Sequence, residues 1–343
     1  MSKGLEDVVA ATSSITYIDG IKGRLLYRGY DIADLVENSS YEETAYLIWN
    51  VRLPAERELS DFTKGLVSKR PIPDGVDSVL NSLPTNCDAM DALKIGVAVL
   101  GIFDDPMYST QEKAASITSK MGTMAATIHR HKHNKQPVRP KDGLNFSSNL
   151  LYMISGKEPD ELMAKVMDVV LILHADHELN ASTFAARVVA STLSDIYSSI
   201  TAAVGALKGP LHGGANEKVV EMTEEIGSPD RAERYVIDKL SRKEKIMGFG
   251  HRVYKTDDPR AKILKDYARK LISTDKDRKD FEILTKLQEV MLKEKQLHAN
   301  VDLFSGFVLN HIGVPTYLFT PIFAVGRSVG WLAHIMEQYS NNR

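Results

Sequence analysis

Helical spacing of apolar residues dominates this chain of 343 residues from Tyr30 onward, and it most constrains the fold. Between Asp91 and Phe103, for example, the apolar side chains follow the spacing of an α-helix. The only good strand signal lies before Tyr30, where residues 15–18 and 24–27 flank an Asp-Gly turn and predict a hairpin. Because no strand pattern alternates with the helices, a Rossmann fold or a barrel is disfavoured. We therefore predict an all-α protein of many helices with a small N-terminal β hairpin.

Two of the predicted helices have unusual compositions. The segment from Asp160 to His174 is apolar on nearly all sides, which predicts a helix at the centre of the core. The segment from Ala181 to Leu207 is rich in Ala, Ser and Thr. We predict that it is a helix that approaches another helix closely, within or between chains. From Pro229 the density of charged residues rises, which suggests a second, more solvated helical domain.

The composition excludes several classes of function. The chain has 43 basic and 45 acidic residues, and its net charge of -2 provides no general attraction for nucleic acid. The single cysteine, Cys87, excludes an intrachain disulfide framework and fits a reducing, cytoplasmic setting. The segment from Met1 to Asp7 has no apolar core of the kind that a secretory signal needs.

One apolar run could be mistaken for a membrane span. No Lys, Arg, Asp or Glu occurs from Leu303 to Gly326, which is long enough to cross a bilayer. The run nevertheless contains Asn310, Pro315 and Pro321, which fit poorly in lipid. We therefore predict buried helices and a loop at the centre of a large core, and no membrane partner.

Four short segments place polar groups in apolar or glycine-rich surroundings. They are residues 174–183, 209–216, 248–260 and 300–306. Taken singly, each could be a helix cap, a turn or a structural ion pair. A metal site at His174 and His177 is disfavoured, because the zinc-binding helix motif needs histidines four residues apart and these are three apart.

Together, these segments suggest catalysis. The candidate side chains are three histidines, one carboxylate and two arginines: His177, His212, His251, Asp302, Arg260 and Arg327. Paired arginine forks suit a dicarboxylate, because each guanidinium can bind a carboxylate through two N–H groups. A neutral histidine can donate to a developing oxyanion, and a lone aspartate can act as a general base. No activated Cys or Ser nucleophile is evident, so covalent acyl transfer is disfavoured.

The motifs around these residues resemble those of citrate synthases. The blocks are Gly-Pro-Leu-His212-Gly-Gly-Ala, Gly-Phe-Gly-His251-Arg-Val-Tyr-Lys, Asp-Pro-Arg260, Asn-Val-Asp302 and Gly-Arg327. With the segment around His177, they occur in the family's order and cover residues 170–340. The opening, Tyr-Ile-Asp-Gly followed by Tyr-Arg-Gly-Tyr, resembles the short archaeal and bacterial form.

The resemblance implies a homodimer of almost wholly helical subunits with two domains. The large domain would comprise residues 1–213, with the chain returning to it at 314–343. A small domain at 214–313 would bind CoA and close over the substrates. The small residues of Ala181–Leu207 would then lie at the dimer interface.

The implied reaction is the condensation of acetyl-CoA with oxaloacetate, followed by hydrolysis of citryl-CoA to citrate and CoA. Asp302 would remove a methyl proton from acetyl-CoA, and neutral His212 would donate a hydrogen bond to the thioester oxygen. His251 would polarise the ketone of oxaloacetate. The resemblance implies no metal and no redox cofactor, since the CoA thioester is itself a substrate.

The resemblance also implies binding residues. His177, Arg260 and Arg327 would hold the carboxylates of oxaloacetate. The loop that corresponds to the family's adenine-binding loop includes Ile246, Gly248, Phe249 and Gly250. Lys255 occupies the position of a cation for CoA phosphate, and Lys293 is a weaker candidate.

Other functions share these motifs. A 2-methylcitrate synthase would use propionyl-CoA, and one methylene in a pocket is worth only about 1–3 kcal/mol, so dual use is plausible. A lyase could run the reaction backwards. A catalytically silent scaffold of the same fold is disfavoured by the intact His212, His251 and Asp302. The family also carries a further arginine near the C-terminus, just beyond the position of Arg343, and we expect a longer native chain that contains it.

Overall fold

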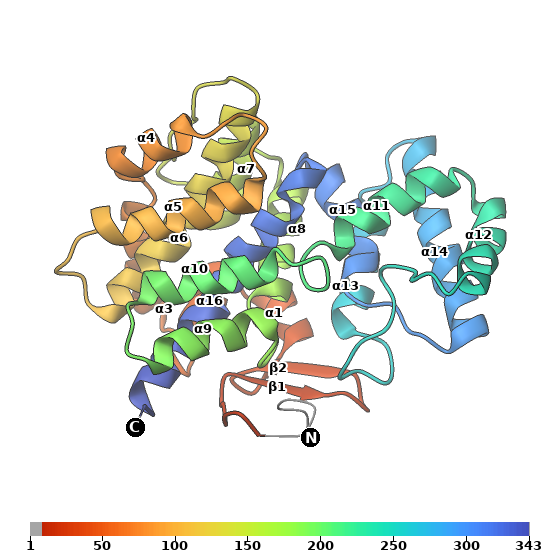
Figure 1. The fold of residues 1–343 in the computed structure, drawn as a ribbon, viewed down its shortest axis with the longest axis horizontal. Helices are drawn as coiled ribbons and strands as arrows, with labels where there is room; N and C mark the ends of the chain where they lie inside the picture. The colour runs from red at the N-terminus through yellow and green to blue at the C-terminus, as the bar shows by residue number, and fades with distance from the viewer. Residues whose placement is uncertain (1–8, 343) are drawn as a thin grey trace.

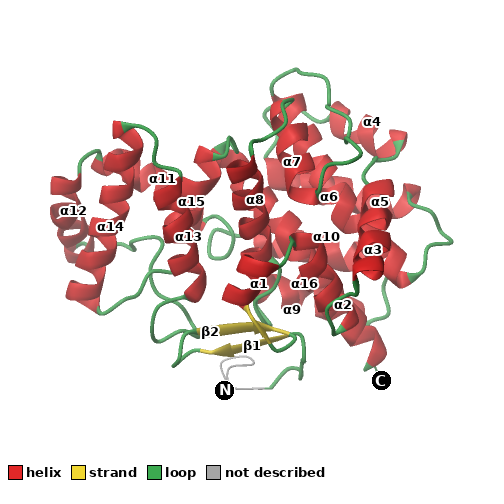
Figure 2. Ribbon diagram, turned by 180° about the vertical axis from the view of Figure 1, so that it is seen from behind, coloured by secondary structure: helices red, strands yellow, loops and turns green. Residues whose placement is uncertain are grey.

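The computed structural model describes residues 9–342, so the segment from Met1 to Asp7 and Arg343 lie outside the described residues. Within that range there are sixteen α-helices, one 3-10 helix and three short strands (Figures 1 and 2). The prediction of an all-α protein with a small N-terminal hairpin is confirmed.

The helices follow one another through short connections. The first eight are α1 (Ile32–Asn38), α2 (Tyr41–Asn50), α3 (Glu56–Ser68), α4 (Asp74–Ser82), α5 (Ala89–Phe103), α6 (Thr110–Lys132), α7 (Phe146–Ser155) and α8 (Glu161–His174). The next seven are α9 (Ala181–Ser191), α10 (Ile196–Leu207), α11 (Ala215–Ile226), α12 (Pro229–Ser241), α13 (Pro259–Lys270), α14 (Asp275–Lys295) and α15 (Asp302–His311). The 3-10 helix η1 (Thr316–Leu318) then leads into α16 (Phe319–Ser340).

The N-terminal strands form one antiparallel sheet in the order β1 (Thr16–Asp19), β2 (Arg24–Tyr27) and β3 (Tyr30–Asp31). Asp19 pairs with Arg24, and its carboxylate accepts hydrogen bonds from two N–H groups of the turn that follows. The sequence did not predict β3, because two residues are too few to show alternation.

Helices α8 and α16 lie at the centre of the molecule. Both are buried along most of their length, which confirms the predicted central helix and the burial of the charge-free run. Gly330 of α16 approaches the end of α8 so closely that an added Cβ would lie 2.8 Å from Asp176 Cβ. The segment Thr316–Ser340 is long and apolar enough to cross a membrane, but its most apolar stretch is entirely buried by other elements.

The prediction of a single helix from Ala181 to Leu207 is wrong. Helix α9 ends at Ser191, Leu193 adopts a left-handed φ of 61°, and Asp195 caps the start of α10. The Asp195 carboxylate accepts from the N–H of Ser198, as N-cap residues do. The small residues let α9 and α10 pack closely against each other, so part of the predicted interface lies within the chain.

Helices α11 to α15 pack mainly on one another and form the right-hand part of the molecule in Figure 1. Contacts of α13 with α1 and α8, and of α15 with α8, connect this group to the remaining helices. The polar segments singled out in the sequence lie where these two groups of helices meet. The predicted boundaries at 213/214 and 313/314 fall between helices and stay a prediction.

Candidate active site

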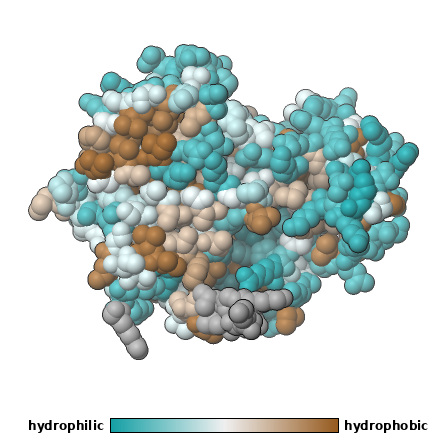
Figure 3. Space-filling model, viewed as in Figure 1, coloured by the Kyte–Doolittle hydropathy of each residue, from teal (hydrophilic) through white to brown (hydrophobic). Residues whose placement is uncertain are grey.

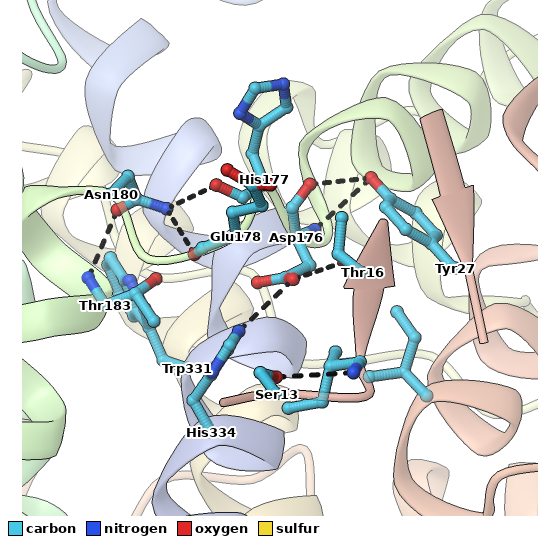
Figure 4. Close-up of polar contacts among 12 residues, drawn as sticks. Ser13, Thr16, Tyr27, Asp176, His177, Glu178, Asn180, Thr183, Trp331 and His334 are labelled. Carbon is cyan, nitrogen blue, oxygen red and sulfur yellow. Dashed lines mark hydrogen bonds and ion pairs between the residues drawn. The ribbon is translucent and has the colours of Figure 1, made fainter. Parts of the chain in front are cut away.

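His177 lies in the connection between α8 and α9, and its neighbour Asp176 anchors that connection. Asp176 Oδ2 accepts from Thr16 Oγ1 at 2.5 Å and from His334 Nε2 at 3.3 Å, and its backbone carbonyl accepts from the Tyr27 hydroxyl at 2.9 Å. Burial alone would raise the pKa of Asp176, but His334 and then Arg327 lower it below its ordinary value. Figure 4 shows the ring of His177 projecting away from this network.

His177 is buried and lacks a partner at one ring nitrogen. Burial, followed by the positive charge of Arg260, lowers its pKa well below the ordinary value, so the ring is neutral. Among residues 9–342 its Nε2 has no hydrogen-bond partner, and neither does the buried hydroxyl of Tyr254, whose ring centroid lies 5.7 Å away. Buried polar atoms are rarely left unpaired, so these two indicate a site that a polar ligand completes.

His251 has a defined tautomer. Its Nδ1 accepts hydrogen bonds from the N–H groups of Val253 and Tyr254, at 3.0 and 3.1 Å. Because Nδ1 is an acceptor, the ring proton must be on Nε2, which can donate to a ligand. Burial and then Arg260 lower the pKa of His251 to about 4, so this neutral form predominates at neutral pH. Its ring centroid lies 5.0 Å from that of His177.

His212 is a neutral donor of the opposite tautomer. Its Nε2 accepts from the backbone N–H of Ser182 at 3.3 Å and lies 2.8 Å from the Ser182 hydroxyl. The remaining proton is therefore on Nδ1. Burial and then Arg327 lower the pKa of His212 to about 4. Trp331 and Asn180 hold the Ser182 hydroxyl in place through further hydrogen bonds.

Asp302 stands at the start of α15 without a hydrogen bond to its carboxylate among residues 9–342. Burial raises its pKa to about 6, although the positive charge of Arg260 opposes the rise. The preceding Asn300 donates through Nδ2 to the carbonyl of Gly250 at 3.0 Å, and its N–H donates to the carbonyl of Gly248 at 3.0 Å. These bonds join the segment of Asp302 directly to the segment of His251.

Two buried arginines supply positive charge. Arg260, at the start of α13, forms a two-pronged ion pair with Asp258, through Nε at 3.0 Å and a terminal nitrogen at 2.8 Å. Arg327, on α16, donates through Nε to the carbonyl of His174 at 2.6 Å and lies over the ring of Phe323. Burial lowers the pKa of Arg327 to about 10, which leaves it cationic at neutral pH.

The structure brings the six predicted catalytic and oxaloacetate-binding residues into one cluster. The charge of Arg260 alters the pKa of His177, His251 and Asp302. The charge of Arg327 alters the pKa of His177 and His212. The rings of His177 and His251 lie 5.0 Å apart, and Phe323 lies beside both the His212 ring, at 6.3 Å, and the Arg327 guanidinium, at 4.8 Å. Together, these contacts and charge effects place the histidines, Asp302 and the two arginines around one site.

The candidate CoA residues are more dispersed. Residues 246–250 form a turn in which Gly248 and Gly250 adopt left-handed φ angles of 85° and 78°, and Phe249 bridges to Ala299. Lys255 is exposed and follows this turn. Lys293 lies on α14, 68% exposed, with its ammonium 3.2 Å from a carboxylate oxygen of Glu233. The structure does not bring Lys293 to the cluster.

Sequence reasoning missed the residues that hold the site together. Ser182 orients His212, and Asp258 orients Arg260. Asn300 joins the segment of Asp302 to that of His251. Each stands within or beside a segment that was singled out. Their partners are separated from them by 2 to 50 positions in the sequence, with no fixed spacing that a motif could show. Only the folded chain therefore shows what they contact.

Comparisons with known proteins agree on one family. The family model described as "Citrate synthase, C-terminal domain" matches residues 4–343. Citrate synthase 2 of Bacillus subtilis is 47% identical, over 100% of this chain and 93% of that protein. A 2-methylcitrate synthase of Shewanella oneidensis is 39% identical, over 99% of this chain and 92% of that protein.

A solved structure shows the same fold with both ligand types present. It is the citrate synthase of Thermoplasma acidophilum in ternary complex with carboxymethyl coenzyme A and oxaloacetate. That structure superposes with a TM-score of 0.94 at 38% identity, over 100% of this chain and 93% of that one. From its sequence, its fold and the residues gathered at its site, the chain belongs to the citrate synthase family.

Proposed function

We propose that this enzyme condenses acetyl-CoA with oxaloacetate and hydrolyses the resulting citryl-CoA to citrate and CoA. One observation carries the proposal: a carboxylate whose pKa is raised to about 6 lies in one cluster with two neutral histidines of opposite tautomer. Carbon–carbon bond formation needs a base at one substrate and a hydrogen-bond donor at each carbonyl oxygen. The ligands of the Thermoplasma acidophilum enzyme support this choice of substrates.

The first step is loss of a methyl proton from acetyl-CoA. The Asp302 carboxylate takes the proton, and the raised pKa makes it a stronger base than an exposed aspartate. The thioester oxygen gains negative charge as the C–H bond breaks, and His212 Nδ1–H donates a hydrogen bond to it. A neutral imidazole suits this role, because its N–H can stabilise the developing oxyanion through a hydrogen bond and keep its proton.

The second step joins the methyl carbon to the keto carbon of oxaloacetate. His251 Nε2–H donates to the ketone oxygen and gives up its proton as the new bond forms, so this oxygen becomes the hydroxyl of the product. A proton from water restores His251, and Asp302 releases the proton that it took from acetyl-CoA, so the condensation consumes no net proton. Arg260 and Arg327 bind the two carboxylates. His177 Nε2, which is unpaired among the described residues, makes a further polar contact with oxaloacetate. Water then attacks the thioester, and CoA leaves as the thiol.

Domain closure would protect this sequence of steps. We assign residues 214–313, which contain α11 to α15, to the small domain, and residues 1–213 and 314–343 to the large domain. The small domain supplies His251, Arg260 and Asp302. The large domain supplies His177, His212 and Arg327. Closing the small domain therefore assembles the site and excludes water until the carbon–carbon bond exists.

The remaining assignments follow the same proposal. The turn with Ile246, Gly248, Phe249 and Gly250 would hold the adenine of CoA. Lys255 would bind a CoA phosphate. Lys293 is the weaker candidate for that role, because its ammonium group already forms an ion pair with Glu233. The reaction needs neither a metal nor a redox cofactor, and we expect no nucleic-acid or membrane partner. We also propose a homodimer and a cytoplasmic location.

Thiol release tests the proposal directly. The protein is mixed with oxaloacetate and either acetyl-CoA or propionyl-CoA, and free CoA is followed with a colorimetric thiol reagent. Release that depends on oxaloacetate and is faster with acetyl-CoA is expected. Faster release with propionyl-CoA would instead identify a 2-methylcitrate synthase, and no release from either would contradict a condensing enzyme. Activity should persist in EDTA.

A further inference from the structure

The turn of the N-terminal hairpin packs directly against the loop that carries His251. Gly20, between β1 and β2, accepts a hydrogen bond from the N–H of Lys255 at 2.8 Å. A Cβ added at Gly20 would lie 2.9 Å from the carbonyl carbon of Val253 and closer still to its oxygen. A Cβ at Gly23 would lie 2.8 Å from the carbonyl oxygen of Asp257. At both glycines of the turn, backbone therefore contacts backbone, and no side chain fits at either position.

Gly20 is not required by the turn itself. Its φ lies outside the left-handed region that favours glycine, so any residue could adopt its backbone conformation. The Asp-Gly pair predicts that the turn is the reason for a glycine at position 20. In the structure the reason is the close approach of the Val253 carbonyl. The constraint at Gly20 is therefore a contact between the hairpin and the His251 loop, and not a property of the hairpin alone.

The peptide groups behind Gly20 are those that orient His251. The N–H groups of Val253 and Tyr254 both donate to His251 Nδ1, and they place the remaining proton on Nε2. Gly20 holds the same short stretch from the other side, through the carbonyl of Val253 and the N–H of Lys255. A displacement of this stretch would move His251 and weaken the bonds that set its tautomer.

The body of the same hairpin holds the segment of the other histidine. Thr16 of β1 donates to the carboxylate of Asp176, and the Tyr27 hydroxyl of β2 donates to its backbone carbonyl (Figure 4). Asp176 immediately precedes His177. One two-stranded element therefore contacts the segments of both His177 and His251, whose rings lie 5.0 Å apart.

We propose that the N-terminal hairpin is a positioning element that sets the placement of His251 against His177, with Gly20 as its positioning residue for the ketone of oxaloacetate. This inference rests on the proposed function, because it assigns the two histidines to one substrate. In the domain division proposed above, the hairpin reaches from the large domain to a loop of the small domain. It therefore defines where that loop stands when oxaloacetate binds.

Gly20→Ala tests the inference. An ordinary C···O contact is about 3.3 Å or longer, so the added Cβ must displace the Val253 carbonyl by about 1 Å. A misplacement of that size at a reacting group can lower kcat about 100-fold, which is the loss we expect. Gly65→Ala on α3, where an added Cβ meets nothing within 4 Å, and Ile21→Ala in the same turn are the matched controls.

The readout that separates positioning from general loosening is the 13C chemical shift of the keto carbon of bound oxaloacetate. A hydrogen bond from His251 to the ketone moves this resonance away from that of free oxaloacetate. In Gly20→Ala the resonance should return toward the free value, while circular dichroism and the unfolding midpoint show a folded protein. Tyr27→Phe keeps the ring but loses the bond to Asp176, and it should shift the resonance in the same direction. It also tests the inference if Gly20→Ala fails to fold.

The outcomes are distinguishable. If both variants keep the resonance and the kcat of the unsubstituted enzyme, the hairpin does not position the histidines and the inference is wrong. If the unsubstituted enzyme itself leaves the resonance at its free position and releases no CoA, the proposed function fails, and the positioning role fails with it.

Discussion

At the scale of single residues, burial sets the chemistry of this site. Burial penalises the charged form of each group, so it lowers the pKa of the histidines and raises that of Asp302. The neighbouring arginines lower the pKa of all four groups, so burial and charge act in the same direction on the histidines and in opposite directions on Asp302.

The raised pKa of Asp302 predicts both a mutational effect and a pH dependence. Asp302→Asn removes the base but keeps the shape, and kcat should fall by at least about 1000-fold. In the unsubstituted enzyme, kcat/KM for acetyl-CoA should decline as the pH falls through about 6, because the carboxylate of the free enzyme is then protonated. A pH–rate profile by thiol release measures this. Turnover of Asp302→Asn near that of the unsubstituted enzyme would contradict the mechanism.

Arg327 should act on oxaloacetate and not on CoA. Arg327→Leu removes one charge-assisted contact to a carboxylate, worth about 1.5–3 kcal/mol, so the KM for oxaloacetate should rise about 10- to 100-fold. Arg242→Leu, which removes an exposed arginine paired with Glu244, is the control. A change confined to the KM for acetyl-CoA would show that the dicarboxylate site is misassigned.

Glu42 is a buried acid that catalysis does not use. Burial and then Asp168 raise its pKa, and its Oε2 has no hydrogen-bond partner in the part of the chain that the structure describes. A carboxyl group whose pKa is higher in the folded protein than in the unfolded chain stabilises the fold most at a pH below its pKa in the unfolded chain. That contribution is lost as the pH rises through its pKa in the folded protein. Glu42→Gln should therefore raise the free energy of unfolding at pH 8 by about 1 kcal/mol, with a smaller gain at pH 5.

Urea unfolding at both pH values measures the effect of Glu42→Gln, and the exposed Glu37→Gln is the control. The amide keeps the acceptor for the N–H of Phe146, which is now bound by Glu42 Oε1. A loss of stability at pH 8 would mean that the ionised carboxylate is favourable where it lies.

At the scale of elements, the approach of α16 to the end of α8 places Arg327 beside His174 and His177. Two glycines one turn apart make this approach possible. At Gly326 an added Cβ would lie 3.2 Å from His174 Cβ, and at Gly330 it would lie 2.8 Å from Asp176 Cβ. The N–H of Gly330 also donates to the carbonyl of Ala175 at 2.9 Å.

Gly330→Ala should disrupt this contact. The added methyl meets backbone and Asp176, neither of which can move freely, so overpacking should lower the free energy of unfolding by about 1–3 kcal/mol. Gly205→Ala on α10, where the nearest atom is Cδ of the flexible Lys94 side chain at 3.7 Å, should instead be neutral or stabilising. Equal unfolding midpoints of the two variants in urea would show that the approach of α16 is not tightly packed.

At the scale of the whole molecule, apolar side chains remain exposed on the side where α5 and α9 lie (Figure 3). Ile102 at the end of α5 is 77% exposed, and Val188 of α9 is 49% exposed. Exposed apolar groups that gather on one side are typical of an interface between subunits. This side therefore supports the proposed homodimer, with α9 contributing small and apolar residues.

Val188→Glu should dissociate the dimer, because a charge would be buried at the interface without a partner. Light scattering after size-exclusion chromatography should give twice the chain mass of 38.1 kDa for the unsubstituted protein and a lower mass for the variant. Ile237→Glu, on the exposed side of α12, should leave the mass unchanged. A mass of one chain for the unsubstituted protein would contradict the homodimer.

The fold class and the central helix could be predicted from the sequence, and so could the six polar residues that lie together at the candidate site. Helical periodicity is a local property, and six polar residues in apolar or glycine-rich segments stand out without knowledge of their partners. The break between α9 and α10 was missed because Asp195 and Leu193 are a weak signal within an alanine-rich stretch. The tautomers of His212 and His251, the raised pKa of Asp302 and the proposed role of Gly20 could be derived only from the folded chain. Each of these depends on contacts between segments distant in the chain, and on the water that those contacts exclude.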